Sequence, residues 1–228
     1  MLFRSDKAPK MQFEPTNYGF RYAAIRKPIR RPETEQYVRT TLFIAPFTVL
    51  IPPNDQYRLA QMLVPIDDVN SMFYWVAWHP EANKGISQEA WRKFCCATVG
   101  VDLDANFRKK RNFENNYEQD RGAMKRGDFT GIQGIPTQDM AMWESMGPIT
   151  DRSRDKPGQS DVAVVQFRRM MVAAVKKFQE GGPAIGTEGW NAEPRTPHVK
   201  LASFEGITPK TTDWRTLGVP DEALVSAK

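Results

Sequence analysis

Residues 57–78 decide the fold and read YRLAQMLVPIDDVNSMFYWVAW. The segments 57–66 and 71–78 are rich in apolar, β-branched and aromatic residues, and the four residues between them, 67–70, are typical of a turn. Two such segments on either side of a short polar turn predict a pair of antiparallel strands. We therefore expect an antiparallel sheet.

Two further strands are predicted upstream of this pair. Residues 18–26 alternate aromatic residues with small or charged ones, which is the period of a strand. Residues 37–51 are rich in β-branched and aromatic residues, and Pro46 implies an edge or a bulge near the middle of that strand. Residues 1–17 are polar and predict irregular structure. Consecutive strands joined by short turns predict a meander.

Two helices are predicted after the strands. Ser87 is a good N-cap for the first, which we expect to end at Gly100. Ser160 and Asp161 cap the second, which runs to about Glu180 before two glycines stop it. Their apolar faces are formed by Ile86, Ala90, Trp91, Phe94 and Ala97 in the first helix, and by Val164, Phe167, Met171, Ala174, Val175 and Phe178 in the second. Helices packed on one face of an antiparallel sheet give an α+β fold.

The predicted elements suggest one domain with a tail. We assign the domain to residues 1–180 and the tail, which is rich in Gly and Pro, to residues 181–228. The tail is expected to be extended and docked by Trp190, Phe204 and Trp214. Residues 101–130 are densely charged and predict a long surface excursion. Its expected apolar anchors are Phe107, Phe113 and Tyr117.

The charge pattern argues against a nucleic-acid partner. The 228 residues include 32 Lys and Arg against 27 Asp and Glu, a net charge of +5 that is scattered along the chain. The basic run 108–111 lies among Glu114, Glu118 and Asp120, which offset it. A chain that binds nucleic acid normally gathers its basic residues into one stripe.

No membrane segment or export signal is predicted. The longest uncharged run, residues 40–54, has 15 residues and contains three prolines, so it is too short and too broken for a membrane helix. No apolar segment follows the charged residues at the N-terminus, so no secretory signal is expected. Cys95 and Cys96 are adjacent, which suits neither a disulfide framework nor a metal clip. A cytoplasmic protein is expected.

The segment 131–149 carries the most informative polar residue. Its glycines and Pro136 lead into a short helix with Thr137 as the expected N-cap. One face of this helix is formed by Asp139, Met142, Trp143 and Met146. A carboxylate on an apolar face must be compensated by a cation, by N–H donors or by a metal ion. Asp139 is therefore interpreted either as a partner of Arg152 or Arg168, as a cap of its own helix, or as a metal ligand.

Residues 138–149 read QDMAMWESMGPI, and Arg168-Arg169 stand in the following predicted helix. Shorter motifs accompany them: Tyr18-Gly19-Phe20-Arg21-Tyr22, Ile51-Pro52-Pro53-Asn54, Pro65-Ile66-Asp67-Asp68, Asp151-Arg152-Ser153 and Gly158-Gln159-Ser160-Asp161. In these motifs the chain resembles the Rieske non-haem iron oxygenases, and among them the oxygenase subunits of the phthalate 4,5-dioxygenase type. These motifs extend over about residues 15–180 in one order, which makes the resemblance more specific than any single short motif.

The resemblance implies a helix-grip fold and an iron site. The family binds Fe(II) with two histidines and one carboxylate, and the carboxylate corresponds to Asp139. It also implies a Rieske [2Fe-2S] cluster, a reductase that delivers electrons from NAD(P)H, and a homotrimeric enzyme. The cluster motifs and the two closely spaced iron histidines have no counterpart here, so we expect a catalytic domain that is incomplete at its N-terminus.

The leading hypothesis is the C-terminal catalytic portion of an aromatic ring-hydroxylating oxygenase, inactive alone, that acts with dioxygen on an aromatic carboxylate. One alternative is a non-catalytic helix-grip module that binds an apolar or aromatic small molecule under its long helix. A third interpretation is an incomplete gene product without a role of its own, with exposed surfaces that favour aggregation.

Other candidate residues have ordinary structural interpretations. His79 ends a predicted strand and His198 lies in the tail, and neither is expected to bind the metal. Arg21 has small neighbours on its strand face, so it is interpreted either as a group for a ligand carboxylate or as a surface arginine. Arg58 opens a second strand.

Overall fold

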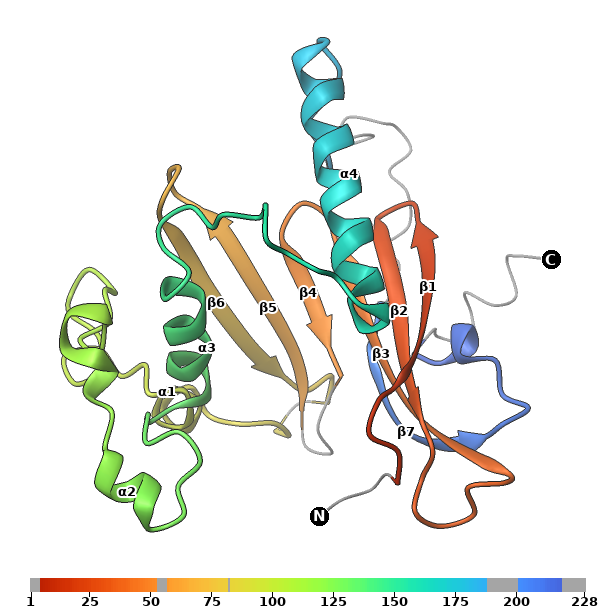
Figure 1. Cartoon of the computed structure of the whole chain (residues 1–228), viewed down its shortest axis with the longest axis horizontal. Helices are drawn as coiled ribbons and strands as arrows, with labels where there is room; N and C mark the ends of the chain where they lie inside the picture. Colours follow the sequence, from red (N-terminus) through yellow and green to blue (C-terminus); the bar gives the residue numbers. More distant parts are fainter. Residues whose placement is uncertain (1–4, 53–56, 82, 188–200, 219–228) are drawn as a thin grey trace. The chain divides into compact units, whose positions relative to one another are not determined.

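The computed structural model describes residues 5–52, 57–81, 83–187 and 201–218. In this part of the chain a seven-stranded antiparallel sheet is combined with four α-helices (Figure 1), which confirms the predicted α+β class. The chain forms two compact units, each considered by itself. The first contains the described residues of 1–65, 71–82 and 156–228, and the second those of 66–70 and 83–155.

The sheet is a meander in which strands adjacent in sequence pair with one another. Its order is β1-β2-β3-β4-β5-β6, and β7 pairs with β3. The bounds are β1 Lys10–Thr16, β2 Gly19–Arg26, β3 Glu35–Ile44, β4 Thr48–Ile51, β5 Arg58–Pro65, β6 Ser71–Trp78 and β7 Phe204–Pro209. The hairpin predicted from residues 57–78 is confirmed as β5 and β6, with Pro65 opposite Ser71.

Strand β1 corrects the prediction of irregular structure for residues 1–17. It pairs with β2 from Lys10 opposite Ile25 to Thr16 opposite Gly19. The segment looked irregular because β1 is an edge strand, whose polar residues are partly solvated while its apolar residues contact the sheet. The polar composition of residues 1–17 was therefore not sufficient to predict irregular structure.

The predicted single strand over residues 37–51 is also wrong. The structure has two strands there, β3 and β4, with Pro46 in the turn between them. The register places Ile44 opposite Thr48, so the chain reverses over three residues. Proline has no backbone N–H, so inside a strand it would leave out one hydrogen bond to the neighbouring strand. In a turn no such hydrogen bond is needed.

Helix α4 packs on the sheet through its N-terminal half. It spans Val162–Gln179, close to the predicted bounds. Ala163 and Phe167 join Phe20 and Phe43 in one apolar cluster, and the rings of Phe43 and Phe167 meet edge to face with centroids 5.1 Å apart.

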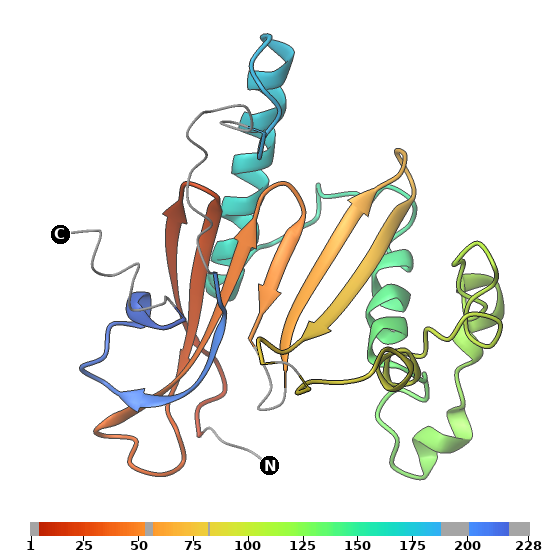
Figure 2. The same cartoon turned by 180° about the vertical axis from the view of Figure 1, so that it is seen from behind.

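The rest of the apolar face predicted for α4 is only partly confirmed. Val164, Val175 and Phe178 are exposed, and Figures 1 and 2 show that the C-terminal half of α4 extends past the ends of the strands. Helical periodicity marks an apolar face but does not show how far the sheet reaches. No helix within the described ranges is long and apolar enough to cross a membrane.

The C-terminal segment docks on the sheet, as predicted. β7 pairs with the first part of β3, whereas β4 pairs with the last three residues of the same strand. The indole of Trp214 packs with Ala23 and Val38, and Phe204 lies against the same cluster. Both aromatic anchors are thus confirmed, and Trp190 lies outside the described residues. The tail therefore contributes to the core of the first unit.

The second unit contains short helices and polar loops. Its helical segments are α1 Gln88–Cys95, η1 Phe113–Glu118, α2 Arg121–Lys125 and α3 Ile135–Glu144. Ser87 is the N-cap of α1, as predicted, and its hydroxyl accepts from the backbone N–H of Ala90. The helix ends at Cys95 rather than Gly100 because Cys96 adopts a left-handed conformation.

The prediction that three aromatic residues anchor the segment 101–130 is wrong for two of them. Phe107 and Phe113 are exposed, and only Tyr117 is buried. The spacing of aromatic residues in the sequence does not predict which of them is buried, because the local backbone conformation decides which side chain turns inward.

Replacement of Trp214 tests whether the docked tail stabilises the first unit. The side chain is only 3 % exposed, so Trp214→Ala is expected to lower the free energy of unfolding by about 3–5 kcal/mol. Urea unfolding followed by circular dichroism measures the change. Phe129→Ala is the control, because Phe129 is 95 % exposed and its loss should cost no more than about 0.5 kcal/mol. Equal effects of the two substitutions would contradict the role of Trp214.

Candidate functional site

The position of α3 is set by the glycines that precede it. Gly134 has φ +81°, and a Cβ atom there would lie 2.8 Å from Cβ of Cys96. Gly131 has φ +67°, and a Cβ atom there would lie 2.4 Å from the carbonyl oxygen of Asp120. At both positions the backbone is left-handed and neighbouring atoms lie too close for a Cβ atom, so only glycine fits. The start of α3 is thereby held against the end of α1.

The helix begins one turn earlier than predicted and buries a different face. Its N-cap is Gly134, and Thr137, the expected N-cap, lies within the helix and is buried. Ala141 is also buried, whereas Met142 is 62 % exposed and Trp143 and Met146 are exposed too. Thr137 and Ala141 are small and allow close packing on this face. Periodicity identified two faces but could not show which one would be covered.

Asp139 is half-buried on α3 and has no partner among the described residues. Arg152, in the same unit, forms its ion pair with Asp155, at 3.4 Å, and not with Asp139. Asp139 does not cap its own helix, since α3 has no side-chain cap. Burial raises the pKa of the Asp139 carboxyl above its ordinary value. The pairing with Arg152 and the helix cap are therefore contradicted within the second unit, and the metal-ligand interpretation stays a prediction.

The donors that a metal ion would need do not gather within the described residues. No group of three or more His, Cys, Asp or Glu side chains in these ranges could hold a metal ion. Nδ1 of His79 accepts a hydrogen bond from the backbone N–H of Glu81, at 3.0 Å, which is the structural role predicted for it. His198 lies outside the described residues. Asp139 could therefore supply one ligand of a larger set.

The two cysteines are free. Burial raises the pKa of the Cys95 thiol to about 12 and also raises that of Cys96. Burial therefore favours the protonated form of both thiols in the folded chain.

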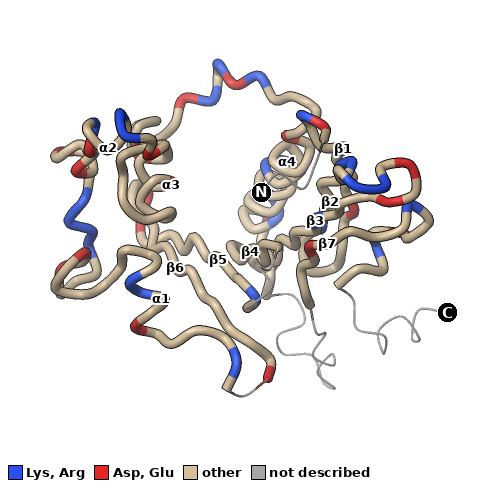
Figure 3. Tube along the Cα trace, turned by 90° about the horizontal axis from the view of Figure 1, so that it is seen from below, with Lys and Arg blue, Asp and Glu red and all other residues tan. Residues whose placement is uncertain are grey.

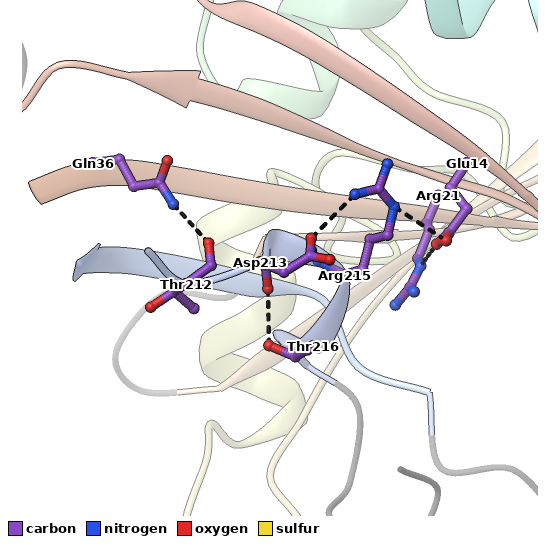
Figure 4. A network of polar contacts seen from close by, with 7 residues as sticks. All are labelled: Glu14, Arg21, Gln36, Thr212, Asp213, Arg215 and Thr216. Carbon is purple, nitrogen blue, oxygen red and sulfur yellow. Dashed lines mark hydrogen bonds and ion pairs between the residues drawn. The ribbon is translucent and has the colours of Figure 1, made fainter. Parts of the chain in front are cut away.

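Arg21 is engaged within the first unit rather than exposed at its surface. Its side chain is largely buried, and its guanidinium pairs with Glu14 and lies 5.5 Å from the ring centroid of Trp214. Arg215 also contacts Glu14, at 3.3 Å (Figure 4). Its guanidinium lies 5.2 Å from the centroid of the same ring. The interpretation as a surface arginine is therefore wrong, because Glu14 and the docked Trp214 surround the side chain. Arg58 is the first residue of β5, as expected.

A polar network around Arg111 holds the loops that flank α3. Its guanidinium contacts Asp102 at 2.7 Å, Glu118 at 3.1 Å and the side-chain oxygen of Gln133 at 3.3 Å. Figure 3 shows acidic and basic residues interspersed along the trace, without one basic stripe. The basic run 108–111 is thus offset by acids, as predicted for Glu118. That Arg111 links these loops was not visible in the sequence.

Comparison with known proteins places the chain in a described family. The family described as LigXa C-terminal domain like matches residues 3–227. The phthalate 4,5-dioxygenase oxygenase subunit of Pseudomonas putida is 53 % identical over 211 residues, which cover 92 % of this chain and 47 % of that protein. The 3-chlorobenzoate-3,4-dioxygenase oxygenase subunit of Comamonas testosteroni is 29 % identical over 235 residues, or 95 % and 51 % of the two chains. The chain spans about half the length of these relatives.

The unpaired carboxylate predicts a pH-dependent effect on stability. Because the pKa of Asp139 is raised in the folded chain, ionisation destabilises the fold as pH rises from the ordinary value of 3.8 through the folded value. In the metal-free chain, Asp139→Asn should therefore raise the unfolding midpoint at pH 7, and the gain should vanish below pH 3.8. Urea unfolding over this pH range measures it.

Asp151→Asn provides a control of opposite sign. Hydrogen bonds from Ser153 lower the pKa of Asp151, so its ionised form is favoured in the folded chain. The control should not stabilise the chain at neutral pH. A lower stability of the Asp139→Asn variant at pH 7 would show that the carboxylate has a stabilising partner.

Proposed function

The chain belongs to the LigXa C-terminal domain-like family, and on this basis we propose that it is the C-terminal catalytic portion of an aromatic ring-hydroxylating oxygenase subunit. The catalytic helix-grip domain is assigned to residues 1–180, and the tail 181–228 adds β7 to its sheet. The identity to two oxygenase subunits over more than nine-tenths of this chain supports the assignment.

An aromatic carboxylate is the proposed substrate. Phthalate and 3-chlorobenzoate, which appear in the names of the two relatives, both combine an aromatic ring with a carboxylate. In the proposed system a reductase passes electrons from NAD(P)H to a Rieske cluster bound outside this chain, and the assembled oxygenase is a homotrimer. Dioxygen is the second substrate.

Asp139 is the proposed carboxylate ligand of the mononuclear Fe(II). The single observation that carries this proposal is a half-buried carboxylate with no cation, donor or cap among the described residues. The negative charge of a half-buried carboxylate must be compensated by a positive charge or by donors, and a metal ion would provide that positive charge. Bound Fe(II) would supply the capacity to activate dioxygen at open coordination positions. The two histidine ligands are expected from the part of the oxygenase that this chain does not span.

The exposed side chains beside Asp139 are proposed to contact the aromatic ring. Met142 and Trp143 lie three and four residues after Asp139, so they share its side of α3. Both are exposed in this chain. Apolar residues around a ring-binding site orient the substrate and exclude water, while the carboxylate holds the metal.

Substitution of the proposed ligand is the direct test. In the intact oxygenase with its reductase, Asp139→Asn should lower product formation by more than about 100-fold. Loss of a residue that hydrogen-bonds to a metal ligand already costs about 10–100-fold, and loss of the ligand itself should cost more. The Rieske absorption should remain unchanged. Product is measured by chromatography and iron content by metal analysis.

The control is Glu89→Gln, which also neutralises a carboxylate on a helix of the second unit, but one that is exposed rather than half-buried. It should retain activity and iron. Full activity of the Asp139→Asn enzyme would refute the ligand assignment.

A second test uses the 228-residue chain alone. One carboxylate and water hold Fe(II) weakly, so the dissociation constant should be no tighter than about 1 mM, or roughly 4 kcal/mol of binding. Anaerobic titration with Fe(II) measures it. Stoichiometric binding at micromolar concentration would show that this chain holds a complete site.

A further inference from the structure

Glu144, the last residue of α3, is held through both of its carboxylate oxygens. The hydroxyl of Tyr117 donates to Oε2 at 2.5 Å, and Nζ of Lys109 donates to Oε1. Nζ of Lys109 also lies 5.8 Å from the centroid of the Tyr117 ring. These three residues, the Glu144 cluster, come from separate segments and meet at the end of the helix. No residue of the cluster has a role in the iron site as proposed above.

The backbone around Tyr117 has an unusual conformation. Asn116, Tyr117 and Glu118 have φ of 52°, 56° and 51°, so three successive residues other than glycine are left-handed. This region is unfavourable for L-residues and persists only where the surroundings enforce it. Strain of this kind is concentrated at functional sites more often than in ordinary loops. The conformation turns Tyr117 inward, whereas its neighbour Phe113 is exposed.

Several contacts enforce this conformation. Asn112 caps η1, with its side chain accepting from the backbone N–H of Glu114 at 3.0 Å. The carbonyl of Asn112 accepts from the backbone N–H of Tyr117 at 2.8 Å. Arg111 pairs with Glu118 at 3.1 Å and with Asp102 at 2.7 Å. The hydroxyl of Tyr117 is therefore presented to Glu144 by a segment that is itself held on both sides.

The two ends of α3 are fixed independently. At its start, Gly134 lies against Cys96 so closely that a Cβ atom would clash. At its end, Glu144 is held by Tyr117 and Lys109. Glu144 lies five residues after Asp139, or about 7.5 Å along the helix axis and on another side of it. Asp139 has no contact that orients it, so its carboxylate is oriented by the helix that carries it.

On the premise of the proposed function, we propose that Tyr117, Glu144 and Lys109 are positioning residues that fix the rotation and depth of α3 and thereby orient Asp139 toward the metal ion. A ligand must be held to within about 0.5 Å of its productive geometry. The cluster can do this without blocking the site, because it holds a different side of the helix. Burial and the nearby Glu144 carboxylate also raise the pKa of Tyr117, which keeps its hydroxyl protonated as a donor.

Tyr117→Phe tests the proposal in the intact oxygenase, because it removes the donor and keeps the ring. The Fe(II) dissociation constant of the mononuclear site should rise by about 10–100-fold, the usual effect of losing a residue that supports a ligand. The ratio of hydroxylated product to dioxygen consumed should fall as well. Glu144→Gln should have a smaller effect in the same direction, since its amide oxygen still accepts from Tyr117. Tyr74→Phe is the matched control, because Tyr74 is exposed on β6.

Three outcomes separate the possibilities. An unchanged Fe(II) affinity and product ratio in Tyr117→Phe, with only a lower unfolding midpoint, would overturn the positioning role, provided that Asp139→Asn loses iron. If Asp139→Asn keeps its iron, the proposed function fails and the positioning role fails with it. If Tyr117→Phe does not fold, Lys109→Gln replaces it, and the same 10-fold or larger loss of affinity is expected.

Discussion

A carboxylate that has been withdrawn from water without a protein partner is the constraint that governs the second unit. Asp139 is half-buried, and no described residue pairs with it or donates to it. Burial raises its pKa, so ionisation of this carboxylate works against the stability of the fold. A sequence under selection for stability alone would replace such a residue, because an amide or an apolar side chain fits the same place at lower cost. As proposed above, a metal ion would be the other half of this interaction.

The second unit places this carboxylate mainly with polar contacts and tight turns. Its α-helices are five to ten residues long, and few of its side chains are fully buried. Two glycines set the entry into α3, and Arg111 links three loop residues around it. The first unit differs, because stacked aromatic rings and the docked Trp214 form a conventional core there. Hydrogen-bonded networks depend more strongly on geometry than apolar packing does, which suits a segment that must orient one side chain.

The sequence predicted the elements with strong periodicity and missed those defined by tertiary context. The β5–β6 hairpin, the Ser87 cap and the bounds of α4 followed from local rules. Strand β1 was missed because an edge strand has no strong apolar alternation, and the break at Pro46 was misread as a bulge. For the site, spacing identified Asp139 but not which face of α3 would be buried. The roles of Tyr117 and Arg111 were not predictable, since they depend on left-handed residues and on loops that meet only in the folded chain.

The way in which α3 is held explains why the side that carries Met142 and Trp143 stays exposed. A surface helix usually buries its apolar stripe and turns its polar residues outward. In α3 the buried residues include Thr137 and Ala141, whereas Met142 and Trp143, beside the half-buried Asp139, are exposed. Because Met142 and Trp143 are exposed, α3 does not gain the stability that burying them would contribute. Other interactions must therefore keep the helix in place. The bonds to Glu144 and the contact at Gly134 supply it without covering the exposed side. A surface that joins a lone carboxylate to apolar side chains is what a metal ion beside an aromatic ring requires.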